Sequence, residues 1–435
     1  MERSTRSCGP TRKRPWVRNL RLVLLLAVVA VSLLLPVLPA AAQVRPTVTD
    51  GGVENRFPEG IVFRVSARSD SPIERIRLRY TIRPDGTAAS SEADFQPATS
   101  VSASFTLEGN NPPRIYLPPG TVIEYFWQVT DAEGDTTSTV PATFFYNDIR
   151  FRWTTLQGDG VTVYYYAGSQ KDAQTMLAVA SETIDSMSKL LGVGIDFPVK
   201  VWIYKSVEDM RPALARRSET FEQSVVTLGV LVTSDTALVL GNASFDTLRH
   251  ELTHAVTAVA GEGAFGSLPA WLDEGTAVYS QSDPGGFGSA LKQAVARGDV
   301  LSVRSISSYP GRPDKVELFY GQSWSLVSYL VKTYGDGKFA QLFAEIKAGK
   351  RIDEALMTVY GIDQDVLEGE WRASLGLPPR EKPAPTEPPL SAAERGVAEE
   401  DGGTPISAVL GVLLGTLALA GAVGLGGLTL ARRMR

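Results

Sequence analysis

Hydrophobic and polar residues follow two different patterns along the chain, and the first pattern covers residues 43–148. Short segments of branched and aromatic residues alternate in part with polar residues, which is the period of a strand with one buried face. Glycine, proline and asparagine separate these segments, and Asp70-Ser71-Pro72 predicts one of the turns. Strands are predicted at Ile61–Ser66, Ile76–Ile82, Ser102–Leu107, Val122–Thr130 and Ala142–Tyr146. Strands spaced in this way predict an all-β sandwich of about seven strands.

The second pattern covers residues 149–375 and mixes strands with helices. Strands are predicted at Val161–Tyr166, Val199–Tyr204, Val225–Val232 and Ala237–Leu240, with a helix at Asp172–Leu191 and another that begins near Asp246. After residue 269 the apolar spacing is almost entirely helical. The helices are predicted at Ala270–Ser280, Gly288–Ala296, Gln322–Tyr334, Lys338–Ile346 and Gln364–Ser374. A mixed sheet followed by helices predicts an α+β domain.

The amino end has the pattern of a targeting segment. Residues 1–42 combine a basic start with an apolar run at Leu22–Leu38 and three small residues at Ala40–Ala42. These features predict a signal peptide that is cleaved before Gln43, and an uncleaved anchor is the alternative.

The carboxyl end has the pattern of a membrane anchor. Residues 376–404 are rich in proline and charge and predict an extended linker. Residues 405–431 include a run of 26 uncharged residues from Ile406 to Ala431, which predicts a transmembrane helix. The tail 432–435 carries three arginines and is expected in the cytoplasm. We therefore expect a single-pass protein of the cell membrane whose folded domains are extracytoplasmic.

Composition and charge narrow the function classes. The chain is 43% hydrophobic and 21% charged, which is enough to bury a sizeable core. Between the two end segments, 33 basic residues face 47 acidic ones, and a body this acidic argues against nucleic-acid partners. Cys8, the only cysteine, lies within the predicted signal peptide. This excludes a disulfide framework, an iron–sulfur cluster and a cysteine zinc site in the mature protein.

Both histidines of the chain fall in one five-residue segment, His250-Glu251-Leu252-Thr253-His254. On a helix, positions i and i+4 share a face, so the two imidazoles can converge on one metal ion. Ser244 or Asp246 can cap this helix and Gly261 can end it. The alternatives are a coincidence of spacing or a purely structural metal site.

Glu274 lies twenty residues after His254 and can complete a site of two histidines and one carboxylate. Three protein ligands leave the fourth zinc position open, as in catalytic zinc sites. Glu251 can then act as the general base that takes a proton from the attacking water. Asp273 is the rival third ligand, but on a helix it points about 100° away from Glu274. We prefer Glu274.

These residues resemble the gluzincin metallopeptidases, the thermolysin and membrane-aminopeptidase group, and specifically the peptidase MA-like family. The resemblance spans roughly residues 150–375. It rests on HELTH at residues 250–254 and on WLDEGTA at residues 271–277, which is similar to the family pattern W-L-x-E-G-x-A. It implies a thermolysin-like fold with one Zn²⁺ between a mixed sheet and a helical lobe. It also implies that Val225–Val232 or Ala237–Leu240 pairs with an extended peptide substrate.

The resemblance also suggests a donor for the oxyanion of the reaction. Tyr320 is similar to the tyrosine that opens a helix in membrane aminopeptidases, although Gln322 and Ser323 replace the Lys-Gly of their pattern. A tyrosine that only packs is the alternative, and Tyr309, Tyr279 and Tyr329 are further candidates. Val278 stands where thermolysin-like enzymes have an acidic residue that orients a histidine, so the residues behind the ligands remain unassigned.

Two functions are compatible with these residues. The first is a membrane-tethered zinc endopeptidase that acts on peptides or proteins, because the Gly-x-Met-Glu-Asn segment with which aminopeptidases hold a free amino end is absent. Its activity should fall below about pH 5.5 as the histidines are protonated. The second is a surface binding protein with an idle zinc domain, whose β domain engages a partner. Pro119–Asp135 loosely resembles fibronectin type III modules, so we expect an immunoglobulin/fibronectin-like fold for the β domain. The sequence leaves the oligomeric state open.

Overall fold

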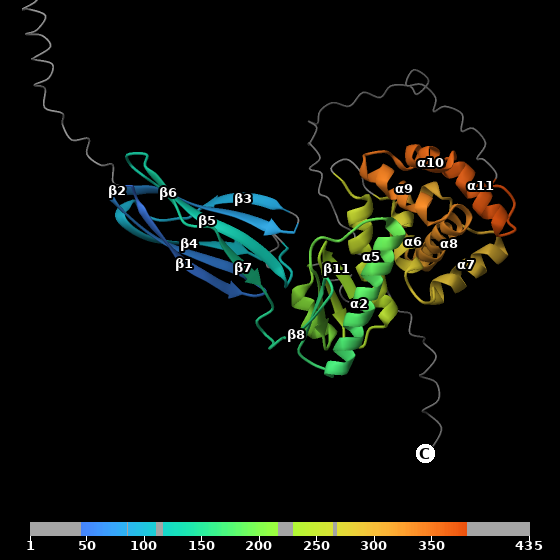
Figure 1. Cartoon of the computed structure of the whole chain (residues 1–435), viewed down its shortest axis with the longest axis horizontal. Helices are drawn as coiled ribbons and strands as arrows, with labels where there is room; N and C mark the ends of the chain where they lie inside the picture. The colour runs from blue at the N-terminus through green and yellow to red at the C-terminus, as the bar shows by residue number, and fades with distance from the viewer. Residues whose placement is uncertain (1–44, 85, 110–115, 216–228, 264–267, 381–435) are drawn as a thin grey trace, which may run out of the picture.

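The computed structural model describes residues 45–84, 86–109, 116–215, 229–263 and 268–380. Within them, a β-rich region is followed by an α+β region, as predicted, and Figure 1 shows the two side by side. The predicted signal peptide, transmembrane helix, basic tail and most of the linker lie outside the described residues. No helix in the described ranges combines the length and the apolar character that crossing a bilayer requires.

The β domain contains seven described strands, all paired antiparallel. The long strand β2 (Gly60–Arg83) is its centre: residues 60–73 pair with β1 and β4, and residues 73–83 pair with β3 and β5. Strands β6 and β7 pair with β5. The other strands are β1 (Thr47–Arg56), β3 (Thr87–Glu92), β4 (Ala98–Glu108), β5 (Thr121–Asp131), β6 (Thr136–Ser138) and β7 (Ala142–Tyr146).

The predicted turn at Asp70-Ser71-Pro72 is wrong, because β2 continues through it. The ladder is irregular between Arg68 and Ile73, where the strand changes partner from β4 to β5. Proline is tolerated at such an irregularity because its missing N–H interrupts no ladder hydrogen bond there. The two halves of β2 therefore belong to opposite layers of one continuous sheet. Phe63 in the first half packs on Tyr125 of β5 with ring centres 4.9 Å apart.

The second sheet has five described strands in the order β11-β12-β10-β9-β8. Strands β9, β10 and β12 are parallel, whereas β8 and β11 are antiparallel edge strands. Helix α2 (Gln170–Leu191) starts with a capping box between Ser169 and Asp172 and crosses the sheet. The strands are β8 (Thr154–Gly158), β9 (Val161–Tyr165), β10 (Val199–Tyr204), β11 (Gly229–Thr233) and β12 (Thr236–Leu240).

The helical region follows the second sheet and has its own apolar core around Trp271, Phe319, Phe343 and Trp371. Helix α10 was not predicted. The helices are α5 (Phe245–Gly261), α6 (Ala270–Tyr279), α7 (Gly285–Arg297), α8 (Val316–Tyr334), α9 (Asp336–Lys347), α10 (Ile352–Tyr360) and α11 (Gln364–Ser374). The short helices are α3 (Val207–Met210) with η1 (Arg211–Ala213), η2 (Arg304–Ser307) and η3 (Pro313–Lys315).

The second sheet is covered on both faces. Helices α2 and α5 pack on the face that carries Val201 and Val239. On the other face, Trp202 and Tyr204 belong to the same hydrophobic cluster as the interior of the β domain. Every residue of β10 is buried as a result. The two domains thus share one continuous core, and the sheet that supports α5 lies between the β domain on one face and helices α2 and α5 on the other.

The junction between the domains also contains a buried ion pair and stacked rings. Lys200 pairs with Asp235 and donates a hydrogen bond of 2.8 Å to the carbonyl of Gly120 in the β domain. Phe145 of β7 stacks on Tyr164 and on Trp202 of the second sheet, with ring centres 6.2 and 6.3 Å apart. These contacts fix the β domain to the second sheet.

Candidate metal centre

Helix α5 carries both histidines, and its start is set by Ser244. The Ser244 hydroxyl accepts a hydrogen bond from the backbone N–H of Thr247 at 3.1 Å, so Ser244 and not Asp246 is the cap. The helix is held on the sheet by Leu248 and Leu252, both fully buried. With that face fixed, His250 and His254 point together toward the adjoining helix α6.

Three nitrogen and oxygen atoms of the predicted ligands converge at this point. The Nε2 atoms of His250 and His254 are 3.3 Å apart, and Glu274 Oε2 lies 3.2 Å from the first and 3.6 Å from the second. Zinc ligands at 2.0–2.1 Å around a tetrahedral centre are separated by about 3.3 Å. The three observed separations agree with that value.

The donor atoms themselves also fit a metal ion. Glu274 Oε2 is buried and has no hydrogen-bond partner among the described residues. A buried carboxylate oxygen that accepts no hydrogen bond is costly unless a positive charge, such as a metal ion or a protonated imidazole, lies against it. The combination of two imidazoles and a carboxylate with no thiolate is typical of catalytic zinc sites. The residues present therefore fit a zinc ion, and their role as its ligands stays a prediction.

Each imidazole has a second contact that orients it. His254 Nδ1 lies 3.1 Å from Asp273 Oδ1, which also accepts a hydrogen bond of 2.5 Å from the Thr257 hydroxyl. On the other histidine, the side-chain amide of Gln281 lies 3.1 Å from Nδ1. The Asp273 carboxylate accepts from the Nδ1–H of His254 and so fixes the tautomer in which its Nε2 is free to bind a metal, whereas the Gln281 contact orients the ring of His250. Asp273, considered above as a rival ligand, thus faces the far nitrogen of His254 rather than the centre of the site.

The charges around His254 hold a proton on it in the metal-free protein. Burial opposes the charged imidazolium, but the nearby carboxylates of Asp273 and Glu274 outweigh it and raise the pKa of His254 to about 10. The same attraction holds the pKa of Asp273 below its ordinary value despite burial. A metal ion must therefore displace this proton.

Glu251 lies on the same helix between the two histidines and faces the edge strand β11. Its Oε2 accepts a hydrogen bond of 2.9 Å from the backbone N–H of Leu231. Burial raises the pKa of the Glu251 carboxyl above its ordinary range, although the neighbouring histidines act in the opposite direction. A carboxylate with a raised pKa can both take and return a proton near neutral pH. Gly229 permits this approach, because a Cβ there would lie 2.8 Å from the Thr247 methyl group.

Tyr320 lies in the second turn of α8, which begins at Val316, so the prediction that it opens the helix is wrong. The true start of the helix has no polar capping side chain that would mark it in the sequence. Instead, η3 leads directly into Val316–Phe319, the first turn of α8. Tyr320 is buried, with its ring centre 6.0 Å from that of His250, and its hydroxyl has no partner among the described residues. Burial and the neighbouring carboxylates raise its pKa well above the ordinary value, so it remains a neutral donor.

Two glycines allow the helices around the site to touch. A Cβ at Gly275, next to Glu274, would collide with the backbone carbonyl of Ser323 in α8. A Cβ at Gly321, next to Tyr320, would collide with the carbonyl of Phe287 in α7. Helices α6, α7 and α8 therefore meet backbone to backbone. This contact sets the depth at which Glu274 reaches the histidines.

Three polar partners of the site were missed by the sequence analysis. Tyr309, considered only as a spare tyrosine, donates a hydrogen bond of 2.6 Å to Glu274 Oε1. Gln281 follows the end of α6, and Leu231 contributes only a backbone group. None of these has a local sequence signal, because each reaches the site through the packing of distant segments.

Residues 179–376 match the family model of the Peptidase MA superfamily, a range that includes all five predicted site residues. This confirms the family resemblance described above. No curated protein sequence matches the chain. Among solved structures, an M1 zinc metallopeptidase from Deinococcus radiodurans is 16% identical over 76% of this chain and 92% of that chain, with a TM-score of 0.33. OgpA from Akkermansia muciniphila is 13% identical over 23% of this chain and 28% of that chain, with a TM-score of 0.19. At these TM-scores neither likeness carries an argument about this protein.

Proposed function

We propose, from the match of residues 179–376 to the family model of the Peptidase MA superfamily, that this protein is a zinc-dependent peptidase. The observation that carries the proposal is the spacing of 3.2–3.6 Å among three donor atoms of His250, His254 and Glu274. Glu251 strengthens it, since a purely structural metal site needs the two histidines but not a buried carboxylate beside them.

In this function the side chains of the chain have separate tasks. His250, His254 and Glu274 would hold one zinc ion, which when bound polarises a carbonyl group and lowers the pKa of water. Glu251 takes the proton of the attacking water and passes it to the leaving amine. Tyr320, kept neutral by its raised pKa, is the candidate donor to the developing oxyanion.

The substrate would be a peptide or protein in extended form. The family resemblance assigns substrate pairing to an edge strand, and β11 is the edge strand next to α5. Its Leu231 N–H is bonded to Glu251. A substrate strand laid along β11 would lie beside the general base, which brings the scissile bond to the site.

We also propose that the enzyme is an endopeptidase tethered to the cell membrane with its catalytic domain outside the cytoplasm. The support is the sequence alone: the absence of an amino-end-binding Gly-x-Met-Glu-Asn segment, the signal-like residues 1–42 and the apolar residues 405–431.

The test is mass-spectrometric detection of new termini in a mixed peptide library incubated with the zinc-loaded, detergent-solubilised full chain. Glu251→Gln, verified to retain zinc, is the matched control because it keeps the ligands and removes the base. Internal cuts by the native protein alone are expected. Trimming from the amino end would indicate an aminopeptidase instead. Zinc binding without cleavage by either protein would favour the binding-protein alternative.

A further inference from the structure

The contact between Tyr309 and Glu274 gives the two oxygens of this carboxylate different surroundings. Oε1 accepts the hydrogen bond of Tyr309 at 2.6 Å, whereas Oε2 faces the two imidazole Nε2 atoms and has no hydrogen-bond partner in the described structure. A carboxylate that is free at both oxygens can bind a metal through either one or both. Here one oxygen is already engaged.

The side chain of Tyr309 is partly buried, and its ring is held by a neighbouring ring. Its ring packs on Phe319 with ring centres 5.6 Å apart. An ionised carboxylate only accepts hydrogen bonds, so the phenolic hydroxyl of Tyr309 is the donor in this contact. Tyr320 does not share this role, because its hydroxyl makes no hydrogen bond within the described residues.

The segment that carries Tyr309, residues 299–309 between α7 and α8, is held from the side by buried polar groups. The Gln322 side chain accepts from the N–H of Leu301 at 2.9 Å and donates to its carbonyl at 2.7 Å. Glu368 of α11 accepts from the N–H of Val303 at 3.0 Å. These bonds replace the backbone pairing that a helix or strand would have provided.

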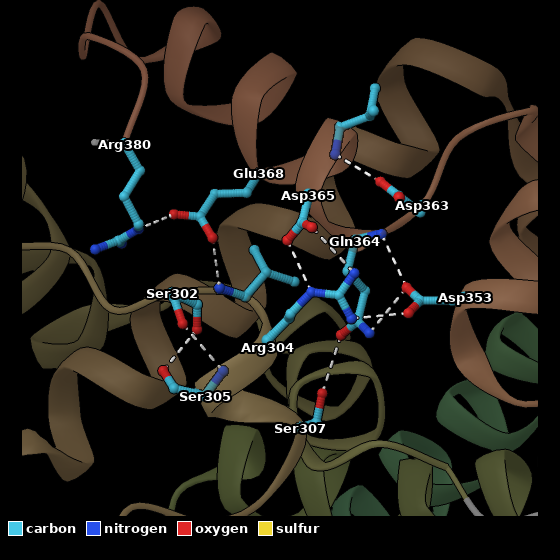
Figure 2. A network of polar contacts seen from close by, with 12 residues as sticks. Ser302, Arg304, Ser305, Ser307, Asp353, Asp363, Gln364, Asp365, Glu368 and Arg380 are labelled. Carbon is cyan, nitrogen blue, oxygen red and sulfur yellow. Dashed lines mark hydrogen bonds and ion pairs between the residues drawn. The ribbon is translucent and has the colours of Figure 1, made fainter. Parts of the chain in front are cut away.

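Figure 2 shows further hydrogen bonds and ion pairs that hold residues 299–309 against α10 and α11. Arg304 bridges Asp353 and Asp365 at 2.8 and 2.7 Å. Ser307, two residues before Tyr309, donates a hydrogen bond of 3.0 Å to Gln364, whose side chain is itself bonded to Asp353. The segment is therefore fixed along its length up to the residue that contacts Glu274.

From this geometry we propose that Tyr309 is a positioning residue that reserves Glu274 Oε2 for the metal ion and prevents the carboxylate from binding through both oxygens. The proposal rests on the zinc site of the proposed function. One oxygen from Glu274 leaves a position open for water among four ligands, whereas two oxygens would fill it. The hydrogen bonds and ion pairs of residues 299–309 keep the Tyr309 hydroxyl in a fixed position, which this role requires.

The test compares Tyr309→Phe with Tyr334→Phe in the full chain. Tyr334 is the matched control because its hydroxyl also donates to a glutamate, Glu370, at 2.9 Å, but away from the site. Zinc affinity is measured by competition with a chromophoric chelator, and the visible spectrum of the cobalt-substituted proteins reports the coordination number. We expect Tyr309→Phe to weaken zinc binding about 10-fold or more and to shift the cobalt spectrum toward higher coordination, with Tyr334→Phe unchanged.

Each outcome has a distinct meaning. Unchanged zinc affinity and an unchanged cobalt spectrum in Tyr309→Phe would overturn the positioning role while leaving the zinc site intact. Failure of the native chain to bind one zinc ion would overturn the proposed function and this inference with it. If Tyr309→Phe does not fold, Arg304→Met releases the segment from Asp353 and Asp365 without touching the site. A weaker zinc affinity in that variant than in Arg312→Met supports the role, and equal affinities overturn it, because Arg312 pairs with Asp314 on the surface.

Discussion

Replacing Gly275 with alanine tests whether backbone contact between α6 and α8 sets the position of Glu274. The new Cβ would lie 2.6 Å from the carbonyl carbon of Ser323 and 2.8 Å from a methyl group of Val327, whereas ordinary contact begins at 3.4 Å. The two helices must therefore separate by about 0.8 Å at this point, since the obstacle is backbone and cannot rotate away. Glu274, the preceding residue, would move with α6.

The magnitude follows from two opposing terms. Overpacking of a tight contact costs about 1–3 kcal/mol, and the higher helix propensity of alanine returns about 1 kcal/mol. A net loss of about 0–2 kcal/mol lowers the melting temperature by up to roughly 8 °C for a domain of this size. Moving Glu274 also lengthens separations that now match a zinc site, so zinc affinity should fall more than 10-fold.

The matched control is Gly369→Ala in α11, where a Cβ would meet nothing within 4 Å. That variant should be as stable as the native protein or more stable, because only the propensity term applies. Thermal unfolding followed by circular dichroism and chelator competition measure the two effects. If Gly275→Ala matched Gly369→Ala in both, backbone contact would not be what positions Glu274.

Three further outcomes are expected. Asp273→Asn should weaken zinc binding about 10–100-fold, seen by chelator competition, because the carboxylate that orients His254 loses its charge; equal affinity would remove Asp273 from the site. Zinc affinity should rise steadily as pH rises toward 10, because His254, with a pKa of about 10, must lose a proton before it binds the metal ion. Calorimetry of zinc binding at pH 7, in buffers of different ionisation enthalpy, should detect the released proton. If no proton is released, the raised pKa of His254 is contradicted. Lys200→Met should cost about 3–5 kcal/mol because it leaves Asp235 buried without its partner, and adding Asp235→Asn should recover part of the loss of melting temperature.

The sequence predicted those parts of the site whose signal is local. The spacing of His250 and His254 defines one helix face by itself, and Glu274 follows on a helix with its own apolar pattern. The β2 strand was misread because Asp70-Ser71-Pro72 has the composition of a turn, although the strand passes through it as it changes layer. Composition reports local preference, and here tertiary pairing overrode it.

The residues that orient the site could not be predicted for a different reason. Asp273 was recognised as an acidic neighbour, but which histidine nitrogen it faces depends on the crossing of α5 and α6. Tyr309 reaches Glu274 only because Gln322 and Glu368 hold an irregular segment in place. Such contacts join residues tens of positions apart and leave no periodic pattern in the chain.

The shared core at the domain junction has a practical consequence for anyone who wishes to divide this protein. Trp202 lies in the α+β domain, yet it is fully buried only while the β domain covers its face of the sheet. Cutting the chain near residue 148 would expose the indole of Trp202 together with Tyr164 and Tyr204. The resulting apolar surface would make the isolated domain prone to aggregation. Inhibitor screens and crystallisation should therefore start from both domains together, and a shift in tryptophan emission would give early warning that they have come apart.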